Sequence, residues 1–321
     1  MAAIRERSVF ERVMIVGVGL LGASLGLALK ERGLAKRVVG VGRAASASLG
    51  IAKARGAIDE AHTEIHTALL RFGRSILSTS GSIPFTGGPQ ELVVLCTPLR
   101  QFPGALEALR GRVGPHLLVT DVGSTKGEVM GWAKRILGAD ARWFVGSHPM
   151  AGSEKHGPGA ARADLYDGAV CLICGGEAEA AALGKIEAMW QAVGMRTLRV
   201  DSAVHDRWVA TISHLPHAVA FSLMNAAARE PESLQAAANG FLDTTRVASS
   251  DVDMWTDIFL TNRAALVAAI DSFTADLSAL KAAVVAGDEP AIRAALSNAK
   301  KSRDELVARR TPGQRESGSG E

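Results

Sequence analysis

The chain has 321 residues, of which 47% are hydrophobic and 5% aromatic, and its formal net charge is +3. This size and apolar content predict two ordinary hydrophobic cores, built from Ala, Leu and Val rather than from aromatic side chains. The small net charge argues against a nucleic-acid partner. No apolar run reaches the length of about 18 residues that a membrane span needs, so no membrane association is expected.

Cysteine usage and the N-terminus predict a cytoplasmic protein without a metal site. Three cysteines are too few for a disulfide framework in a chain of this size, and no signal peptide is recognised. Cys171 and Cys174 have the spacing of a metal or redox pair, but in a strand such residues point to opposite faces. His62 and His66 also have metal-ligand spacing. No third ligand is evident near them, so we interpret them as exposed helix histidines.

Short apolar runs alternate with helical patterns over the first two hundred residues. Most runs are continuously hydrophobic, which is typical of strands covered on both faces. This alternation predicts an α/β fold with a Rossmann-type, doubly wound, mainly parallel sheet. The predicted strands are Val13–Val16, Val38–Val41, Leu92–Cys96, Leu117–Thr120, Trp143–Val145, Ala169–Ile173 and Thr197–Val200. The predicted helices between them are Ser24–Arg32, Phe102–Leu109, Lys126–Leu137 and Ala178–Val193. Ser75–Gly88 is rich in Ser, Gly and Thr and predicts a surface loop.

The character of the sequence changes after about Asp201. No strand is predicted beyond this point, and Ala264–Ala286 shows the clearest helical pattern. We therefore predict a Rossmann-type domain over 1–200, an all-helical C-terminal domain over 201–306, and a flexible tail over 307–321. The Ala-rich helix faces suit tight packing, including packing between two subunits.

A glycine-rich turn follows the first predicted strand and indicates a dinucleotide site. In the pattern Gly17-Val18-Gly19-Leu20-Leu21-Gly22, Gly17 permits the tight turn, Gly19 lets the backbone approach the ligand closely, and Gly22 permits helix packing. The helix that begins near Leu21 directs its first amides at a pyrophosphate. We expect Gly17, Gly19, Leu20, Leu21 and Gly22 to contact the cofactor.

The end of the second predicted strand bears on the choice of cofactor. An acidic residue there would bind the ribose 2′-hydroxyl of NAD, but this chain has Arg43 instead, which is placed to meet a 2′-phosphate. NADP is therefore favoured over NAD. The alternative is that Arg43 stacks on the adenine and the cofactor is NAD. Thr97 and Pro98, at the end of the fourth strand, are expected to shape the nicotinamide side of the crevice.

Four further motifs occur in a fixed order after the glycine turn. They are DVGSTK at 121–126, GSHPMAGSE at 146–154, SHLPH at 213–217 and GFLDTTRVASSDVDMW at 240–255. The second motif places His148 just beyond a predicted strand, in a polar turn. Together with GVGLLGASLGLAL, these motifs resemble the prephenate/arogenate dehydrogenase family, in its monofunctional form. At this length, we expect neither the regulatory ACT domain nor the chorismate mutase domain that some members carry.

The resemblance implies a reaction and assigns residues to it. Members oxidise and decarboxylate prephenate or arogenate with NAD or NADP, and the family expectation is a cytoplasmic homodimer formed through the helical domain. By the same resemblance, His148 accepts the hydrogen of the ring hydroxyl, and Ser124 contacts and orients that hydroxyl. Arg246 binds a substrate carboxylate, for which a planar two-pronged donor is suited. Further residues implied to line the substrate pocket are Ser213, His217, Trp255 and Ser153.

Two other functions are compatible with a Rossmann half followed by a helical half. A β-hydroxyacid dehydrogenase or imine reductase would normally use a catalytic lysine where this chain has SHLPH. A non-catalytic NAD(P)H-sensing protein would lack a base and a carboxylate anchor, yet both His148 and Arg246 are present. For Arg246, an ordinary ion pair with Asp243 or Asp251 is the structural alternative. Ser213 and His217 could instead serve helix packing.

Overall fold

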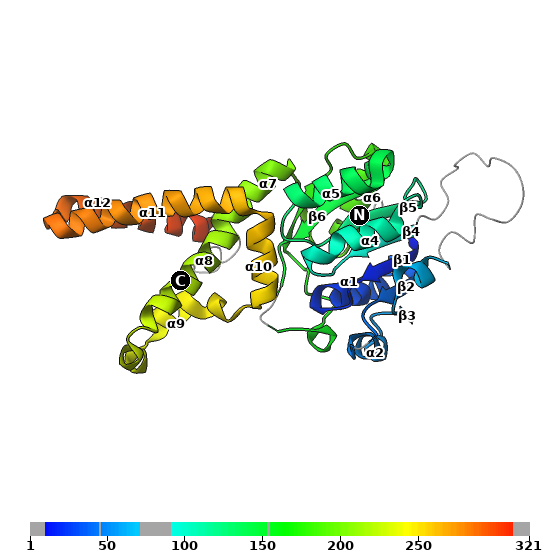
Figure 1. Ribbon diagram of the computed structural model, residues 1–321, viewed down its shortest axis with the longest axis horizontal. Coiled ribbons are helices and arrows are strands. Elements are labelled where there is room, and N and C mark those ends of the chain that lie inside the picture. The colour runs from blue at the N-terminus through cyan, green and yellow to red at the C-terminus, as the bar shows by residue number, and fades with distance from the viewer. Residues whose placement is uncertain (1–9, 45, 71–90, 153–154, 311–321) are drawn as a thin grey trace, which may run out of the picture. The chain divides into compact units, whose positions relative to one another are not determined.

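The computed structural model describes residues 10–44, 46–70, 91–152 and 155–310. The chain divides into two compact units, Met1–Leu266 and Val267–Glu321. The first contains an eight-stranded sheet with the order β3-β2-β1-β4-β5-β6-β7-β8 (Figure 1). Neighbouring strands are parallel except β6 and β7. The strands are β1 (Phe10–Val16), β2 (Ala35–Val41), β3 (Glu60–His62), β4 (Glu91–Leu95), β5 (Leu117–Asp121), β6 (Phe144–Pro149), β7 (Val170–Cys174) and β8 (Arg196–Arg199).

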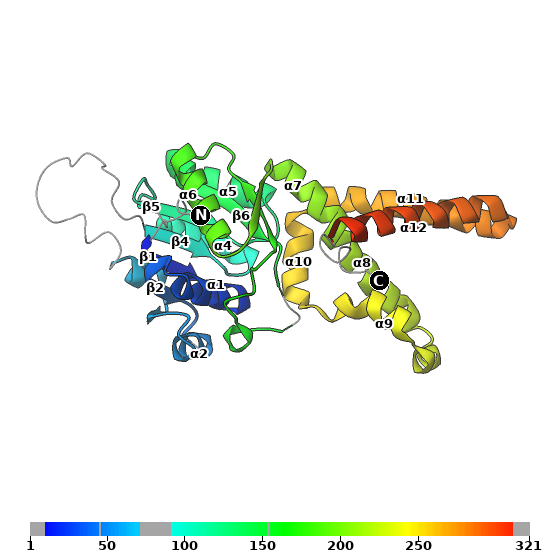
Figure 2. The same cartoon turned by 180° about the vertical axis from the view of Figure 1, so that it is seen from behind.

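Helices lie on both faces of this sheet, as the two opposite views show (Figures 1 and 2). Those that follow the strands in the chain are α1 (Leu20–Glu31), α2 (Ser48–Ala54), α3 (Ile65–Leu69), α4 (Phe102–Leu109), α5 (Gly127–Leu137) and α6 (Ala180–Ala192). After β8 the described chain is helical: α7 (Ser202–Val209), α8 (Leu215–Ala227), α9 (Asn239–Thr245), α10 (Val252–Thr261), α11 (Arg263–Ala286) and α12 (Glu289–Arg310). The predicted combination of a doubly wound, mainly parallel sheet and a helical C-terminal part is confirmed.

Each central strand contributes to two separate hydrophobic cores. In β1, Val13 and Ile15 enter a cluster that includes residues of α1 and α6, whereas Met14 and Val16 enter a cluster with residues of α3, α4 and α5. Successive side chains of a strand point to opposite faces, so a strand buried on both faces must be apolar at every position. This explains the continuous apolar runs in the sequence.

Two local predictions were wrong. The edge strand β3 was missed because Glu60–His62 contains no apolar run, and His62 therefore lies in a strand rather than in a helix with His66. His148 lies within β6 rather than in a turn after it. There it pairs with Leu172 of β7, in the antiparallel register that extends β6 to Pro149.

Capping interactions set several boundaries in the helical part. The Asp201 carboxylate accepts hydrogen bonds from the backbone N–H groups of Ala203 and Val204 and starts α7. Gly287, with φ of 64°, follows α11 in a Schellman arrangement. Helix α12 continues to Arg310, so the predicted tail begins later than residue 307. The predicted domain boundary near residue 200 stays a prediction.

Three predicted features lie outside the described residues: the Ser75–Gly88 loop, Ser153, and the tail from residue 311 onward. Among the helices that are described, none alone has the length and apolar character to cross a membrane. Only the bent pair α10 and α11, taken together, has them.

Candidate active site

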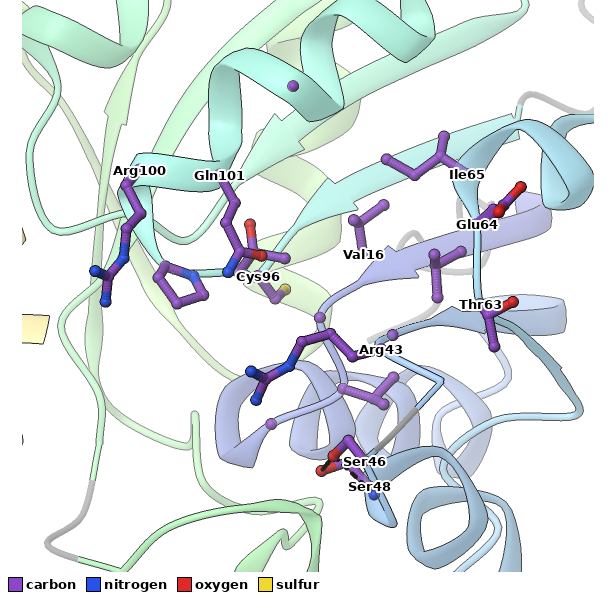
Figure 3. Close-up of a pocket in the computed structure, with 18 of the residues that line it drawn as sticks. Val16, Arg43, Ser46, Ser48, Thr63, Glu64, Ile65, Cys96, Arg100 and Gln101 are labelled. Atoms are coloured by element: carbon purple, nitrogen blue, oxygen red, sulfur yellow. Dashed lines mark hydrogen bonds between the residues drawn. The ribbon is translucent and has the colours of Figure 1, made fainter. Parts of the chain in front are cut away.

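A cavity of about 830 Å³ opens at the carboxyl ends of β1, β2 and β4 (Figure 3). In a parallel sheet this edge, where the strand order reverses between β1 and β4, is where ligands bind. The wall contains Gly17 and Gly19 of the glycine turn, together with Thr97 and Pro98 after β4. The structure thus brings these four predicted residues together at one cavity. Leu20, Leu21 and Gly22 lie in the first turn of α1, directly after the turn that lines the cavity.

The glycine turn fits a dinucleotide. A Cβ atom on Gly17 would lie 2.6 Å from the Cys96 carbonyl, so only glycine allows this approach of β1 to the loop after β4. A Cβ atom on Gly22 would lie 2.1 Å from the Gly17 oxygen, which keeps α1 against the turn. Above Gly19 nothing lies within 4 Å, so the backbone there is open to a ligand. Gly17, Gly19 and the first amides of α1 would hold the pyrophosphate.

One polar atom in the cavity also points to a ligand. The Thr97 hydroxyl oxygen is buried and has no hydrogen-bond partner among the described residues. A buried hydroxyl without a partner is costly. Because Thr97 lines the cavity, a bound cofactor would supply that partner.

The segment that follows β2 lines one end of the cavity with Arg43, Ser46 and Ser48 (Figure 3). Arg43 is exposed, and the hydroxyl groups of Ser46 and Ser48 lie 2.8 Å apart. Sequence reasoning missed Glu64, whose carboxylate comes from the loop between β3 and α3 and lines the same cavity. The signal was absent because β3 itself was not predicted.

A buried chain of hydrogen bonds begins at His148. Its Nδ1 lies 2.9 Å from Nε2 of His205, and Nδ1 of His205 lies 2.8 Å from Oδ1 of Asp206. The Asp206 carboxylate also accepts hydrogen bonds of 2.8 Å from the backbone N–H groups of Lys126 and Gly127. His148 comes from β6, His205 and Asp206 from α7, and the two amides from the start of α5. One carboxylate therefore connects three elements.

A second buried carboxylate, Asp121, organises the loop after β5. Its Oδ2 lies 2.5 Å from the Lys126 ammonium nitrogen and accepts from the Gly123 N–H at 2.8 Å. Its Oδ1 accepts from the backbone N–H of Ser147, the neighbour of His148, at 3.0 Å. Lys126 and Asp121 are both fully buried. This pair fixes the loop that carries Ser124 against the strand that carries His148.

Ser124 lies in this loop and is half-buried. Asp121 holds the residue before it, Gly123, while Asp206 holds Lys126 two positions after it. Since β5 and β6 are parallel, their carboxyl ends meet at one edge of the sheet. The structure thus brings Ser124 and His148 to the same edge.

A second group of predicted residues gathers between α8, α9 and α10. The ring of His217 stacks on Trp255, with centroids 3.5 Å apart, and its Nδ1–H donates to the Ser213 carbonyl at 2.8 Å. Arg246 is exposed and close enough for its charge to act on His217. Trp255 is buried, and its indole N–H has no partner among the described residues.

The structure bears on two expectations about this group, the conformation at Ser213 and the alternative ion pair of Arg246. Ser213 lies in a π-helical turn, Ala210–His214, rather than in regular α-helix. The ion pair of Arg246 with Asp243 or Asp251 that was the alternative is not among the ion pairs of residues 10–44, 46–70, 91–152 and 155–310. The Arg246 guanidinium is thus available to an anionic ligand.

Burial dominates the protonation of the histidines. It lowers the pKa of His148 well below its ordinary value, and the nearby charges of His205 and Lys126 act in the same direction. Burial also lowers the pKa of His205, against the opposing effect of Asp206. For Asp206, burial alone would raise the pKa, but the hydrogen bonds from His205 and the two α5 amides lower it. At neutral pH, His148 is therefore a neutral acceptor.

Sequence reasoning missed His205, Asp206, Asp121 and Lys126. Asp121 and Lys126 stand at the two ends of the DVGSTK motif, which was quoted only for Ser124. The adjacent His205 and Asp206 resemble an ordinary polar first turn of a helix, and nothing local indicates that they face β6.

Fold and site together define a class of protein. A glycine turn that fits a pyrophosphate and a buried neutral imidazole at the same sheet edge belong to a nicotinamide-dinucleotide-dependent dehydrogenase. Residues 88–199 match the family described as "Prephenate dehydrogenase, nucleotide-binding domain". Residues 201–298 match "Prephenate dehydrogenase, dimerization domain".

Two individual dehydrogenases are also similar to the chain in sequence. The chain is 30% identical over 307 residues to prephenate dehydrogenase of Bacillus subtilis, covering 93% of this chain and 77% of that protein. Cyclohexadienyl dehydrogenase of Zymomonas mobilis is 34% identical over 204 residues, covering 62% of this chain and 69% of that protein.

Solved structures agree as well. Prephenate dehydrogenase from Aquifex aeolicus, in complex with hydroxyphenyl propionate and NAD+, superposes with a TM-score of 0.81 at 31% identity, over 92% of this chain and 98% of that one. For arogenate dehydrogenase from Synechocystis the TM-score is 0.74 at 26% identity, over 92% and 99%. The chain belongs to the prephenate/arogenate dehydrogenase family, and it is an oxidoreductase.

The buried Asp121–Lys126 pair yields a stability prediction. Lys126→Met leaves a carboxylate buried without its cation, so we expect the free energy of unfolding to fall by about 3–5 kcal/mol. Lys134→Met is the matched control, because Lys134 makes an exposed ion pair with Glu177 and such pairs contribute about 1 kcal/mol or less. Urea unfolding measures both. A similar small loss in the two variants would contradict the structural role of Lys126.

Proposed function

We propose that the protein catalyses the NAD(P)-dependent oxidative decarboxylation of prephenate, arogenate or both, giving 4-hydroxyphenylpyruvate or tyrosine. The observation that carries this proposal is His148, a buried imidazole held neutral at the sheet edge where the dinucleotide cavity opens. Relatives named for prephenate, cyclohexadienyl and arogenate dehydrogenase support the same substrate class.

The reaction requires the protein to orient the substrate and to provide a proton acceptor. Prephenate carries a ring hydroxyl and, across the ring, a carboxylate on a quaternary carbon. A bound nicotinamide would supply the acceptor for the hydride of the carbinol carbon. His148 Nε2 accepts the hydroxyl proton as the carbon becomes ketone-like. The bond to the carboxylate then breaks, CO2 leaves, and its electron pair completes the aromatic ring. The proton returns to the phenolate oxygen, so the reaction releases no net proton.

The remaining residues would hold the substrate ring in place. We assign to Ser124 a hydrogen bond to the ring hydroxyl, and to Arg246 the binding of a carboxylate. His217, with Trp255 stacked on it, forms one wall of the pocket. Ser213 positions that wall through its carbonyl, which accepts the His217 hydrogen bond. Ser153 is assigned to the pocket on the sequence resemblance alone.

The decisive experiment follows NAD(P)H formation with prephenate and with arogenate, each with NAD and with NADP. We expect turnover in at least one of the four combinations. His148→Asn should lower kcat by about 100-fold or more, while KM for the substrate changes only a few-fold, because the proton is transferred in the transition state. The absence of turnover in all four combinations would overturn the proposal. A large rise in KM at constant kcat would make His148 a binding residue.

We propose NADP as the preferred cofactor. Support comes from the exposed guanidinium of Arg43 and the two serine hydroxyls at the same end of the cavity, with no carboxylate at the end of β2. The complex of the Aquifex aeolicus enzyme contains NAD+.

Arg43→Ser tests the cofactor preference. A charge-assisted hydrogen bond contributes about 1.5–3 kcal/mol, so KM for NADP should rise by roughly 10- to 100-fold, while KM for NAD stays within about twofold. Initial rates with each cofactor measure both constants. Equal changes for the two cofactors would contradict a contact between Arg43 and the 2′-phosphate.

We also propose that the protein acts as a homodimer in the cytoplasm. Large apolar side chains are exposed on the helices that match the dimerization domain, such as Leu277 and Val285 of α11. Such side chains favour a partner surface. All three cysteines are free, which suits a reducing compartment. Sedimentation at twice the chain mass of 33.5 kDa would identify the dimer, and sedimentation at the chain mass would exclude it.

A further inference from the structure

The hydrogen-bonded chain His148–His205–Asp206 can run in only one of two directions. A neutral imidazole carries one N–H group and one bare nitrogen, so each ring donates on one side and accepts on the other. All three residues are buried, with exposures of 8%, 0% and 8%. The direction of this hydrogen-bonded series is therefore set by the groups at its two ends rather than by bulk water.

Asp206 determines the direction at its end. Two backbone N–H groups, of Lys126 and Gly127, donate to its two oxygens. These donors, at the start of helix α5, favour the ionised carboxylate. A carboxylate can only accept hydrogen bonds. The 2.8 Å contact with His205 therefore requires the hydrogen to be on Nδ1 of His205.

The tautomer of His205 in turn determines the tautomer of His148. If His205 carries its hydrogen on Nδ1, its Nε2 is bare and must accept across the 2.9 Å contact with His148. Nδ1 of His148 is then the donor. A neutral His148 with hydrogen on Nδ1 has its lone pair on Nε2, the nitrogen at the other side of the ring.

The opposite direction would require a protonation state that the surroundings disfavour. It needs a cationic His205 or a protonated Asp206. The Lys126 ammonium opposes a positive charge on both rings, and its ion-pair partner Asp121 acts in the other direction at His205. His214 adds a further imidazole on the side of the π-helical turn. Burial opposes a second cation in the same place.

We propose that His205 and Asp206 are positioning residues that hold His148 in the tautomer with hydrogen on Nδ1, which leaves Nε2 free to accept the substrate's hydroxyl proton. His205 and Asp206 also stabilise the positive charge that His148 carries after it accepts the proton, because two hydrogen bonds connect its ring to the Asp206 carboxylate. This role rests on the proposed function for its kinetic consequence, but the tautomer itself can be observed without substrate.

The tautomer is measured by two-bond 1H–15N correlation spectra of the full-length protein labelled with 15N-histidine, at neutral pH. His148 is assigned by the signals that disappear in His148→Asn. We expect the shift of a bare nitrogen at Nε2 and of a protonated nitrogen at Nδ1. Hydrogen on Nε2, or averaged shifts of two exchanging tautomers, would overturn the proposal. This result does not depend on which substrate the enzyme uses.

A matched pair of variants tests the consequence for turnover. His205→Gln keeps an oxygen near the place of Nε2, where it accepts from His148, whereas the shorter side chain of His205→Asn does not reach it. We expect His205→Asn to lower kcat by about 10- to 100-fold, as part of the 100- to 10,000-fold contribution typical of a positioned base. KM should stay within about threefold, and His205→Gln should recover most of the loss.

Other outcomes separate this inference from the proposed function. Equal losses of kcat in the two variants, or a rise in KM alone, would overturn the positioning role even with an active wild type. No turnover in the wild type would overturn the proposed function, and the spectra of the wild type would still decide the tautomer. Thermal unfolding of both variants identifies any general loss of the fold.

Discussion

The arrangement of the site depends on the carboxylate of Asp206. A buried carboxylate must be surrounded by donors, because desolvation without them would cost several kcal/mol. Here the donors come from two sources: the first amides of α5 and the ring of His205. Satisfying one charge therefore fixes the start of α5 relative to α7, and through His205 it fixes the ring of His148 in β6.

Asp121 provides the complementary constraint on the sheet side. Its hydrogen bonds reach the loop that carries Ser124 and the backbone beside His148, while Lys126 neutralises its charge. The two carboxylates thus hold His148, the proposed proton acceptor, and the backbone beside it. Such preorganisation lowers the barrier because little rearrangement is left for the moment of reaction.

Much of the fold followed from the sequence because its signals are local. Continuous apolar runs identified the strands buried on both faces, and the glycine turn identified the switch point of the sheet. Elements that depend on pairing were harder to predict. Strand β3 has no apolar run of its own, and β6 reaches His148 only because β7 pairs with it in antiparallel register.

The residues of the candidate site also differ in whether a local signal or a distant contact makes them important. Gly17 and His148 were predicted as site residues from their motifs, and Thr97 from its place at the end of a predicted strand. His205 was not, since its importance comes from a contact across 57 positions of the chain. The neutral state of His148 could not be predicted either, because it results from burial among His205 and Lys126.

In the proposed mechanism, a neutral, buried imidazole at His148 accepts the proton of the ring hydroxyl. The pH dependence of kcat/KM, compared between the wild type and His148→Asn, tests it most directly. The pKa of His148 is lowered, so the account predicts a wild-type plateau that extends below the ordinary histidine pKa of 6.5 and then falls as His148 takes up a proton. The variant should lack this acid limb. An identical acid limb in both proteins, or a wild-type rate that rises as the pH falls, would contradict the account.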